Sequence, residues 1–112
     1  MKLVVAIINP FKLDELQSAL AAENIAGLTA SEVQGYGRQR GHKEIYRGAE
    51  YLIKMIPKVK VEVAIPADRV EAVVETIMRT ARTGHVGDGK IFIMDLERVY
   101  RIRTGETDAA AL

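Results

Sequence analysis

The sequence contains no cysteine, so neither a disulfide bond nor a metal site built on thiolates is open to it. This absence favours a reducing compartment, and we predict a cytoplasmic protein. Long apolar runs are missing too. The run at residues 3–8 stops at Asn9 and Pro10, which is too short for a membrane span or a signal-peptide core. Direct insertion into a membrane is therefore not expected.

The chain also lacks an excess of either charge. Sixteen lysines and arginines stand against fifteen aspartates and glutamates, which gives a net charge of +1. The total charge therefore does not indicate binding to nucleic acid. A chain of 112 residues can bury one hydrophobic core, and we predict a single domain over residues 1–112.

What the sequence does contain is a duplicated pattern. Residues 2–7 and 60–65 are near copies, rich in β-branched residues, and each predicts a strand. Apolar residues at spacings of three and four follow each copy and predict two amphipathic helices. These residues are Leu13, Leu16 and Leu20 in the first half, and Val70, Val73, Val74, Ile77, Met78 and Ala81 in the second. A further strand, at residues 28–36 and 91–95, closes each half.

The order β-α-β, long loop, β-α-β predicts an α+β fold of the ferredoxin-like type. In this fold a four-stranded antiparallel sheet carries both helices on one face. The other face would be mixed, because valine and isoleucine alternate along residues 59–65 with Lys60, Glu62 and Ala64. A mixed face suits an oligomer contact, so we expect self-association. A monomer with a solvated sheet face is the alternative.

A long basic segment, GRQRGHKEIYRGAEYLIKMIPK at residues 37–58, separates the two halves. Loops of this length in compact domains are usually functional or disordered. Its cations outnumber its two carboxylates, Glu44 and Glu50, and form a local cationic surface. They are Arg38, Arg40, Lys43, Arg47, Lys54 and Lys58.

The segment TGHVGDGKIFI, residues 83–93, fits the spacing of a Walker A loop only superficially. Ile91 stands where a hydroxyl should meet magnesium, and the segment leads from a helix into a strand, the reverse of a P-loop. Gly87, Asp88 and Gly89 can nevertheless turn backbone N–H groups toward one anion, to which Lys90 adds a charge. The alternative is a plain glycine turn entering a strand.

Two arginines further along suggest what that anion is. Arg101 and Arg103 are predicted to point the same way from an extended segment, as suits a polyphosphate. Alone they would favour a solvated edge strand. Together with Lys90, Arg38 and Lys58 they favour a nucleotide.

Catalytic patterns are weak. His42 and His85 are isolated, and the sequence shows no catalytic triad and no metal-binding histidine spacing, so a binding protein is favoured over an enzyme. Two alternatives stay open. One is a weak ATPase, for which no base is identified. The other is RNA binding through Tyr36, Tyr46 and Tyr51, although the chain has no RNA-recognition signature and nucleic acid is not the expected partner.

A family resemblance favours one of these possibilities. YRGAEY, residues 46–51, and TGHVGDGKIFI resemble the two signatures of the PII nitrogen-regulatory signal-transduction proteins, and NPFKLDEL, GYGRQRG, IPK and RIRTGE resemble that family elsewhere. The resemblance covers nearly the whole chain. It implies a homotrimer whose three lateral clefts bind ATP or ADP. It also implies that residues 37–55 are the T-loop, which contacts target proteins, and that residues 97–112 form a C-terminal segment.

The resemblance assigns residues to the nucleotide. Those matching the phosphate positions are Gly87, Asp88, Gly89 and Lys90, with Arg101 and Arg103 reaching across the subunit boundary. Those matching positions around the adenine and ribose are Gly27, Thr29, Gly35, Glu62 and Ala64.

A second ligand, 2-oxoglutarate, would bind at the root of the T-loop. Arg38 and Gln39 match this root, and Gln39 would complete a magnesium shell formed by the ATP phosphates and 2-oxoglutarate. Lys58 would pair with the distal carboxylate of the acid. Backbone N–H groups would assist near three glycines, which are Gly37, Gly41 and Gly87.

The resemblance therefore implies a sensor without turnover that regulates nitrogen-assimilation targets. Arg47 resembles the tip residue that enters ammonium-channel pores, and Tyr51 resembles the tyrosine that bacterial uridylyltransferases modify. The implied partners are an ammonium channel, which would recruit the protein to the membrane, a uridylyltransferase, and regulatory enzymes or kinases. An unmodified Tyr51 is the alternative.

Some positions depart from the family pattern. Asn9 stands where lysine is frequent, Lys43 where threonine is common, and Ala64 where valine is frequent. Ala64 keeps a backbone contact to the nucleotide possible. Lys43 and Lys54 make the T-loop more basic, which bears on the choice of target.

Overall fold

The computed structural model describes residues 1–37 and 54–112. Its strands are β1 (Lys2–Ile8), β2 (Thr29–Gly35), β3 (Ile56–Ile65) and β4 (Lys90–Asp95). Its α-helices are α1 (Leu13–Ala22) and α2 (Val70–Ala81), and its short 3-10 turns are η1 (Pro10–Lys12), η2 (Ala67–Arg69) and η3 (Asp108–Ala111). No helix in the described ranges is long and apolar enough to cross a membrane.

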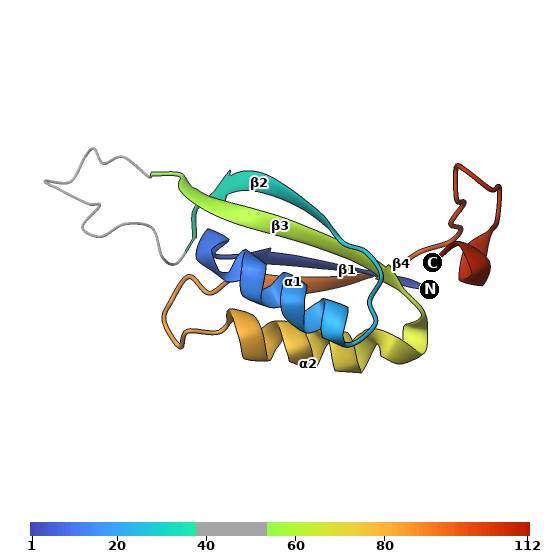
Figure 1. Cartoon of the computed structure of the whole chain (residues 1–112). Coiled ribbons are helices and arrows are strands. Elements are labelled where there is room, and N and C mark those ends of the chain that lie inside the picture. Colours follow the sequence, from blue (N-terminus) through green and yellow to red (C-terminus); the bar gives the residue numbers. More distant parts are fainter. Residues whose placement is uncertain (38–53) are drawn as a thin grey trace, which may run out of the picture.

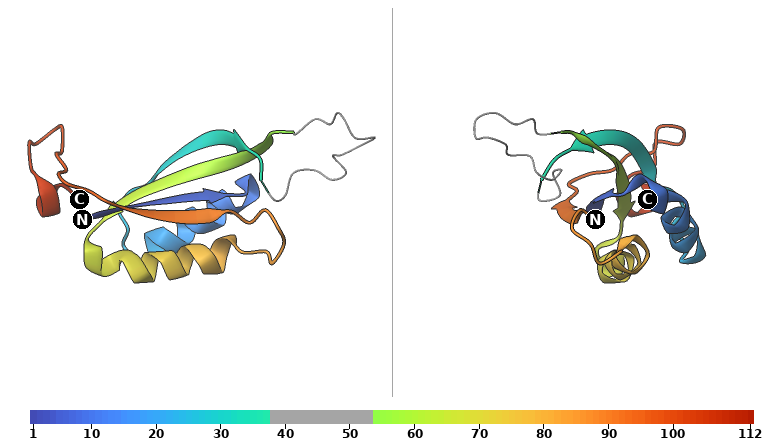
Figure 2. Two further views of the ribbon diagram at one scale, coloured as in Figure 1. Left: turned by 180° about the vertical axis from the view of Figure 1, so that it is seen from behind. Right: turned by 90° about the vertical axis from the view of Figure 1, so that its left-hand side faces the viewer.

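The four strands form one antiparallel sheet in the order β2-β3-β1-β4. Both α-helices lie on the same face, as the end-on view in Figure 2 shows most plainly. The chain passes through strand, helix and strand twice (Figure 1). This architecture confirms the predicted ferredoxin-like double βαβ fold.

The element boundaries follow local chemistry. Pro10 begins η1, where its missing N–H costs nothing, and α1 continues from that turn. β3 begins four residues earlier than the predicted strand at 60–65 and includes Pro57. Pro57 is tolerated because β1 pairs with β3 only from Val59 onward, so β2 is its one neighbour in the sheet there.

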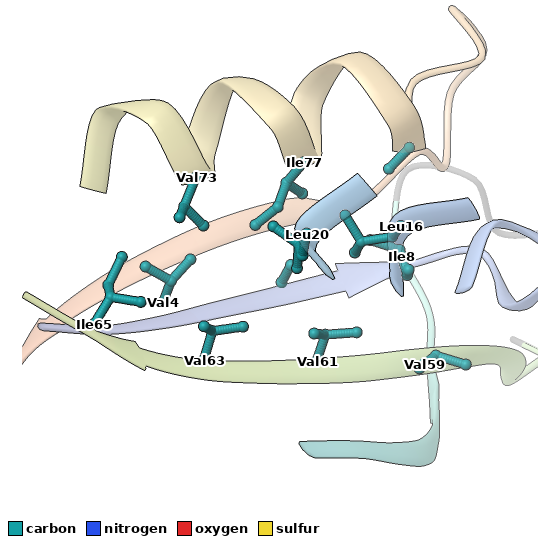
Figure 3. Close-up of a cluster of buried hydrophobic side chains, with 12 residues drawn as sticks. Val4, Ile8, Leu16, Leu20, Val59, Val61, Val63, Ile65, Val73 and Ile77 are labelled. Carbon is teal, nitrogen blue, oxygen red and sulfur yellow. The ribbon is translucent and has the colours of Figure 1, made fainter. Parts of the chain in front are cut away.

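Alternating side chains form the core between the sheet and the helices. Val4 and Ile8 of β1 and the odd-numbered residues 59–65 of β3 meet Leu16 and Leu20 of α1 and Ile77 of α2 (Figure 3). Most of these side chains are at most about 2% exposed. Burying each one stabilises the fold by roughly 1.5–3 kcal/mol relative to an exposed side chain. The period of two in the strands and 3.6 in the helices thus produces a single core.

The helix-free face of the sheet is mixed, as predicted. The register places Val5 and Phe92 side by side with Glu62, and Leu3 beside Met94 and Ala64. Phe92 and Met94 are 48% and 46% exposed. An apolar strip therefore runs along β1 and β4, while β3 and β2 contribute more polar residues. Self-association through this face stays a prediction.

The prediction of an extended segment at Arg101 and Arg103 was wrong. Residues 102–104 form a turn, in which the Gly105 N–H donates to the Arg101 carbonyl over 2.8 Å and Gly105 has a φ of 76°. The Arg101 N–H also donates to the Glu106 carbonyl over 2.8 Å. These backbone bonds fold the segment back on itself, so the two arginines do not alternate along a strand.

Candidate functional site

The loop between α2 and β4 is organised by one carboxylate. Asp88 accepts hydrogen bonds from the backbone N–H groups of Thr83 and Gly84, at 2.8 and 2.9 Å, and from the Thr83 hydroxyl at 2.5 Å. The Thr83 hydroxyl is the largest cause that lowers the pKa of Asp88, to about 2. The carboxylate therefore stays ionised and holds the two ends of the loop together.

Glycine is required where this loop meets β1. Gly89 has a φ of +108°, and a Cβ atom built on it would lie 1.7 Å from the Ile7 carbonyl oxygen. Gly87 has a φ of 103°, also outside the range that L side chains favour. Glycines in this conformation permit the backbone concavities that bind anions. The loop follows a helix and enters a strand, so the rejection of a P-loop is confirmed.

Lys58 connects β3 to this loop. Its Nζ donates to the Gly87 carbonyl over 2.5 Å and to Asn9 Oδ1 over 2.7 Å. The side chain is only 9% exposed. Burial lowers the pKa of Lys58, against the opposing charge of Asp88. A groove of about 650 Å³ between β2, β3 and the start of α1 includes Lys58 in its lining.

The register assembles neighbouring rows on the helix-free face. Ile7 pairs with Lys60 on one side and with Lys90 on the other, so both ammonium groups belong to one row. Thr29 and Glu62 pair in the next row, two residues along, which is about 7 Å away. The predicted phosphate and base positions thus share one face. Lys60 belongs to this set although sequence reasoning did not select it as a site residue.

Other predicted site residues are not adjacent within the chain. Gly27 precedes the start of β2, whereas Gly35 ends that strand opposite Ile56 and Gly37 follows it. The length of β2 separates them by about 20 Å. Ala64 pairs with Leu3 one row beyond Glu62.

The C-terminal arginines lie at the far end of the sheet. β4 begins at Lys90 and ends at Asp95, which pairs with Lys2, and residues 97–112 follow as a small lobe beside the N-terminus (Figures 1 and 2). Arg101 Nη1 donates to Glu106 over 2.6 Å, and Arg103 is exposed. Within one chain the lobe therefore does not meet the loop that carries Gly87 and Lys90.

Comparison with known proteins gives a consistent answer. Residues 1–106 match the family model "Nitrogen regulatory protein P-II". The chain is 58% identical to nitrogen regulatory protein P-II 1 of Escherichia coli K12, with all 112 residues of both chains aligned. The P-II proteins of Klebsiella oxytoca and Rhizobium etli are 57% and 56% identical, again with complete coverage of both chains.

The chain belongs to the P-II family of nitrogen regulatory proteins. The suspected resemblance is confirmed, and with it a role in the signalling that regulates nitrogen use. The family is one of regulators that act on partner proteins.

Part of the predicted site lies outside the described residues of this P-II protein. That part comprises Arg38, Gln39, Gly41, Arg47 and Tyr51. Within residues 1–37 and 54–112, no group of three or more His, Asp or Glu side chains could hold a metal ion. The roles given to Gln39 and Tyr51 therefore stay predictions.

Sequence reasoning noticed Asn9 only as a departure from the family pattern. The structure places its side chain on Lys58 Nζ, 49 residues along the chain. The only available signal was its place at the end of a predicted strand, directly before Pro10. A contact at that sequence separation follows from the pairing of β1 with β3.

Proposed function

We propose that this P-II protein is a non-catalytic sensor of ATP or ADP and of 2-oxoglutarate, which regulates nitrogen-assimilation targets through its T-loop. The observation that carries the proposal is the hydrogen bond from buried Lys58 to the Gly87 carbonyl. It joins the residue expected to bind a dicarboxylate to the loop expected to bind phosphates. A ligand at either place would therefore act on the other.

The donor set fits a nucleotide. Lys90 and Lys60 lie in one row, and the positive-φ glycines of the adjoining loop permit a backbone concavity of the kind that binds anions. Thr29 and Glu62 in the next row supply polar groups for the base or ribose. Charge-assisted hydrogen bonds contribute about 1.5–3 kcal/mol each, so a few of them suffice for micromolar binding.

The separation of the arginines supports a homotrimer. Arg101 and Arg103 lie at the opposite end of the sheet from Lys90, so they would reach a bound phosphate only from another subunit. Ile102 between them is fully exposed, as expected for a side chain that a second subunit covers. The exposed Phe92 and Met94 strip would bury in the same assembly.

Gln39 and Lys58 would join the two ligands. With magnesium held by ATP phosphates, Gln39 would complete the metal shell, and the metal supplies a Lewis-acidic centre for the keto acid. Lys58 would pair with the distal carboxylate. The two ligands would then bind with positive coupling, which thermodynamic linkage makes reciprocal.

The T-loop would carry the response. Arg47 at its tip would enter the pore of an ammonium channel, and Tyr51 would accept a uridylyl group from a uridylyltransferase. That modification adds a bulky anion to a cationic loop and so changes which partner it fits. 2-Oxoglutarate at the loop's root would shift the populated loop conformations by its difference in affinity among them.

Calorimetric titration of 2-oxoglutarate tests the proposal. Saturable binding is expected with magnesium-ATP and not with magnesium-ADP or without nucleotide. Lys58→Met is expected to weaken 2-oxoglutarate about a hundredfold, because the carboxylate loses a buried cation, with ATP binding retained. Lys2→Met, at the other end of the sheet, is the matched control. Binding of 2-oxoglutarate regardless of nucleotide, or none with ATP present, would contradict the proposal.

A further inference from the structure

Asn9 lies at a fixed joint in the chain. It follows β1 and precedes Pro10, with φ and ψ of −70° and 140°, and its carbonyl accepts the Lys12 N–H over 3.0 Å. Asparagine at such a position usually caps the following turn with its side chain. Here the side chain makes no capping hydrogen bond. It is directed to Lys58 instead.

The orientation of the Asn9 amide follows from hydrogen-bond chemistry. A lysine ammonium carries donors and no acceptor, so only the amide oxygen can face it. Asn9 Oδ1 accordingly lies 2.7 Å from Lys58 Nζ. The Nδ2 group belongs to the same planar amide and carries two N–H donors, so it lies close to the oxygen that Lys58 contacts.

Asp88 attracts the charge of Lys58 from beyond salt-bridge distance, and no hydrogen bond of Lys58 neutralises it. Its two acceptors, Asn9 Oδ1 and the Gly87 carbonyl, are both formally neutral. None of the ion pairs within residues 1–37 and 54–112 includes Lys58. The ammonium group has three N–H donors, and these contacts use two. A buried cation in this condition gains from an added anion.

We propose that Asn9 is a specificity-determining residue for the carboxylate that binds at Lys58. Oδ1 positions the ammonium group, and Nδ2 donates a second hydrogen bond to the same carboxylate. The inference rests on the proposed function, in which this is the distal carboxylate of 2-oxoglutarate. The neutral side chain is essential to it, because asparagine holds Lys58 while leaving its positive charge for the ligand.

The near-isosteric Asn9→Asp tests this role most sharply. An aspartate would pair with Lys58, cancel its charge and repel the incoming carboxylate. In magnesium-ATP we expect 2-oxoglutarate to bind about a hundredfold more weakly. Asn9→Leu removes the hydrogen bonds without adding charge, and we expect about a tenfold loss. ATP binding measured alone should change less than about twofold in both variants.

Asn24→Asp is the matched control, because it makes the same chemical change on an exposed residue after α1. Its φ of 64° is one that aspartate also tolerates. 2-Oxoglutarate affinity should be unchanged there. A purely structural role for Asn9 predicts instead that both Asn9 variants weaken ATP and 2-oxoglutarate in parallel, and that outcome would overturn the inference.

The outcomes separate the two proposals. If the unmodified chain binds 2-oxoglutarate and Asn9→Asp binds it equally well, the role of Asn9 is wrong and the sensor stands. If the unmodified chain does not bind 2-oxoglutarate in magnesium-ATP, the sensor itself is wrong. If Asn9→Asp and Asn9→Leu lose affinity equally, charge at this position does not matter and the specificity role fails.

Discussion

The two ends of the sheet are held together by different contacts. At one end Lys58 of β3 donates to Asn9 after β1 and to the Gly87 carbonyl in the loop before β4, and Asp88 accepts from Thr83 within that loop. At the other end the C-terminal lobe is closed by its own pairs, and just before it the Leu96 N–H donates to the Met1 carbonyl. The first end is held together by side-chain hydrogen bonds between separate elements. The second end is a separate lobe that is joined to the sheet.

The two ends also differ in whether their positive charges are already paired with a carboxylate. Lys58 is buried against neutral acceptors, so its charge is available to a ligand. Arg101 is already paired with Glu106 and half-exposed. A site that used both ends would be preorganised at the lysine and would require exchange of partners at the arginine. Preorganised donors cost less to engage on binding.

The largest effect should come from substituting Gly89, at the end of the sheet that contains Lys58. In Gly89→Ala the new Cβ meets the Ile7 carbonyl at 1.7 Å and the residue keeps a φ of +108°. We expect a loss of more than about 3 kcal/mol in the free energy of unfolding, or failure to bind ATP in any folded fraction. Chemical denaturation followed at equilibrium measures the first, and ATP calorimetry the second.

Gly84→Ala separates the clash from the backbone strain. Gly84 has a φ of +91°, but a Cβ there meets nothing within 4 Å. It should cost only about 1–2 kcal/mol, the price of the left-handed backbone alone. Equal losses of unfolding free energy in Gly84→Ala and Gly89→Ala would mean that the close approach of Gly89 to β1 does not determine the stability of this loop.

The same contrast explains what the sequence could predict. The alternation in residues 59–65 and the helical spacing up to Ala81 are local patterns, and they predicted the sheet, the helices and the core. The contact between Asn9 and Lys58 spans 49 residues and depends on strand register, which the pattern did not carry. Arg101 and Arg103 were misplaced because the turn at Gly105 overrides their alternation.

A smaller effect should reveal whether two chains share a site. Lys90→Ala and Arg103→Ala are each expected to weaken ATP about tenfold, because each removes one charge-assisted contact. If the protein is the proposed homotrimer, a site in a mixed trimer would be intact only where Lys90 of one subunit meets Arg103 of the next. Random mixing of the two variants should therefore restore about a quarter of the tight sites.

The number of tight sites is measured by ATP calorimetry after the two variants are unfolded together and refolded. Each variant refolded alone is the control and should show no tight sites. If mixing restores none, both residues act within one chain or not on the same ligand, and the proposed sharing between subunits is wrong.

The smallest effect concerns two carboxylates, one at each end. The pKa of Asp88 is lowered to about 2 and that of Asp108 is also lowered, chiefly by the Val99 N–H. A carboxylate whose pKa is lower in the folded than in the unfolded state stabilises the fold while it is ionised. The stabilisation is therefore fully present above the unfolded value of 3.8, and for Asp88 it is lost as the pH falls through about 2.

Asp88→Asn and Asp108→Asn should each lower the melting temperature at pH 6, and for Asp88→Asn the difference from the unmodified chain should shrink between pH 4 and pH 2. The variants should differ in ligand binding. Asp88→Asn loosens the loop that carries Gly87 and Lys90 and should weaken ATP by a few fold, since it replaces charge-assisted hydrogen bonds from Thr83 and Gly84 with weaker bonds to a neutral amide oxygen. Asp108→Asn loosens only its lobe and should affect ATP less. A larger effect of Asp108→Asn would show that the C-terminal lobe, and not the loop that carries Gly87 and Lys90, sets the affinity for ATP.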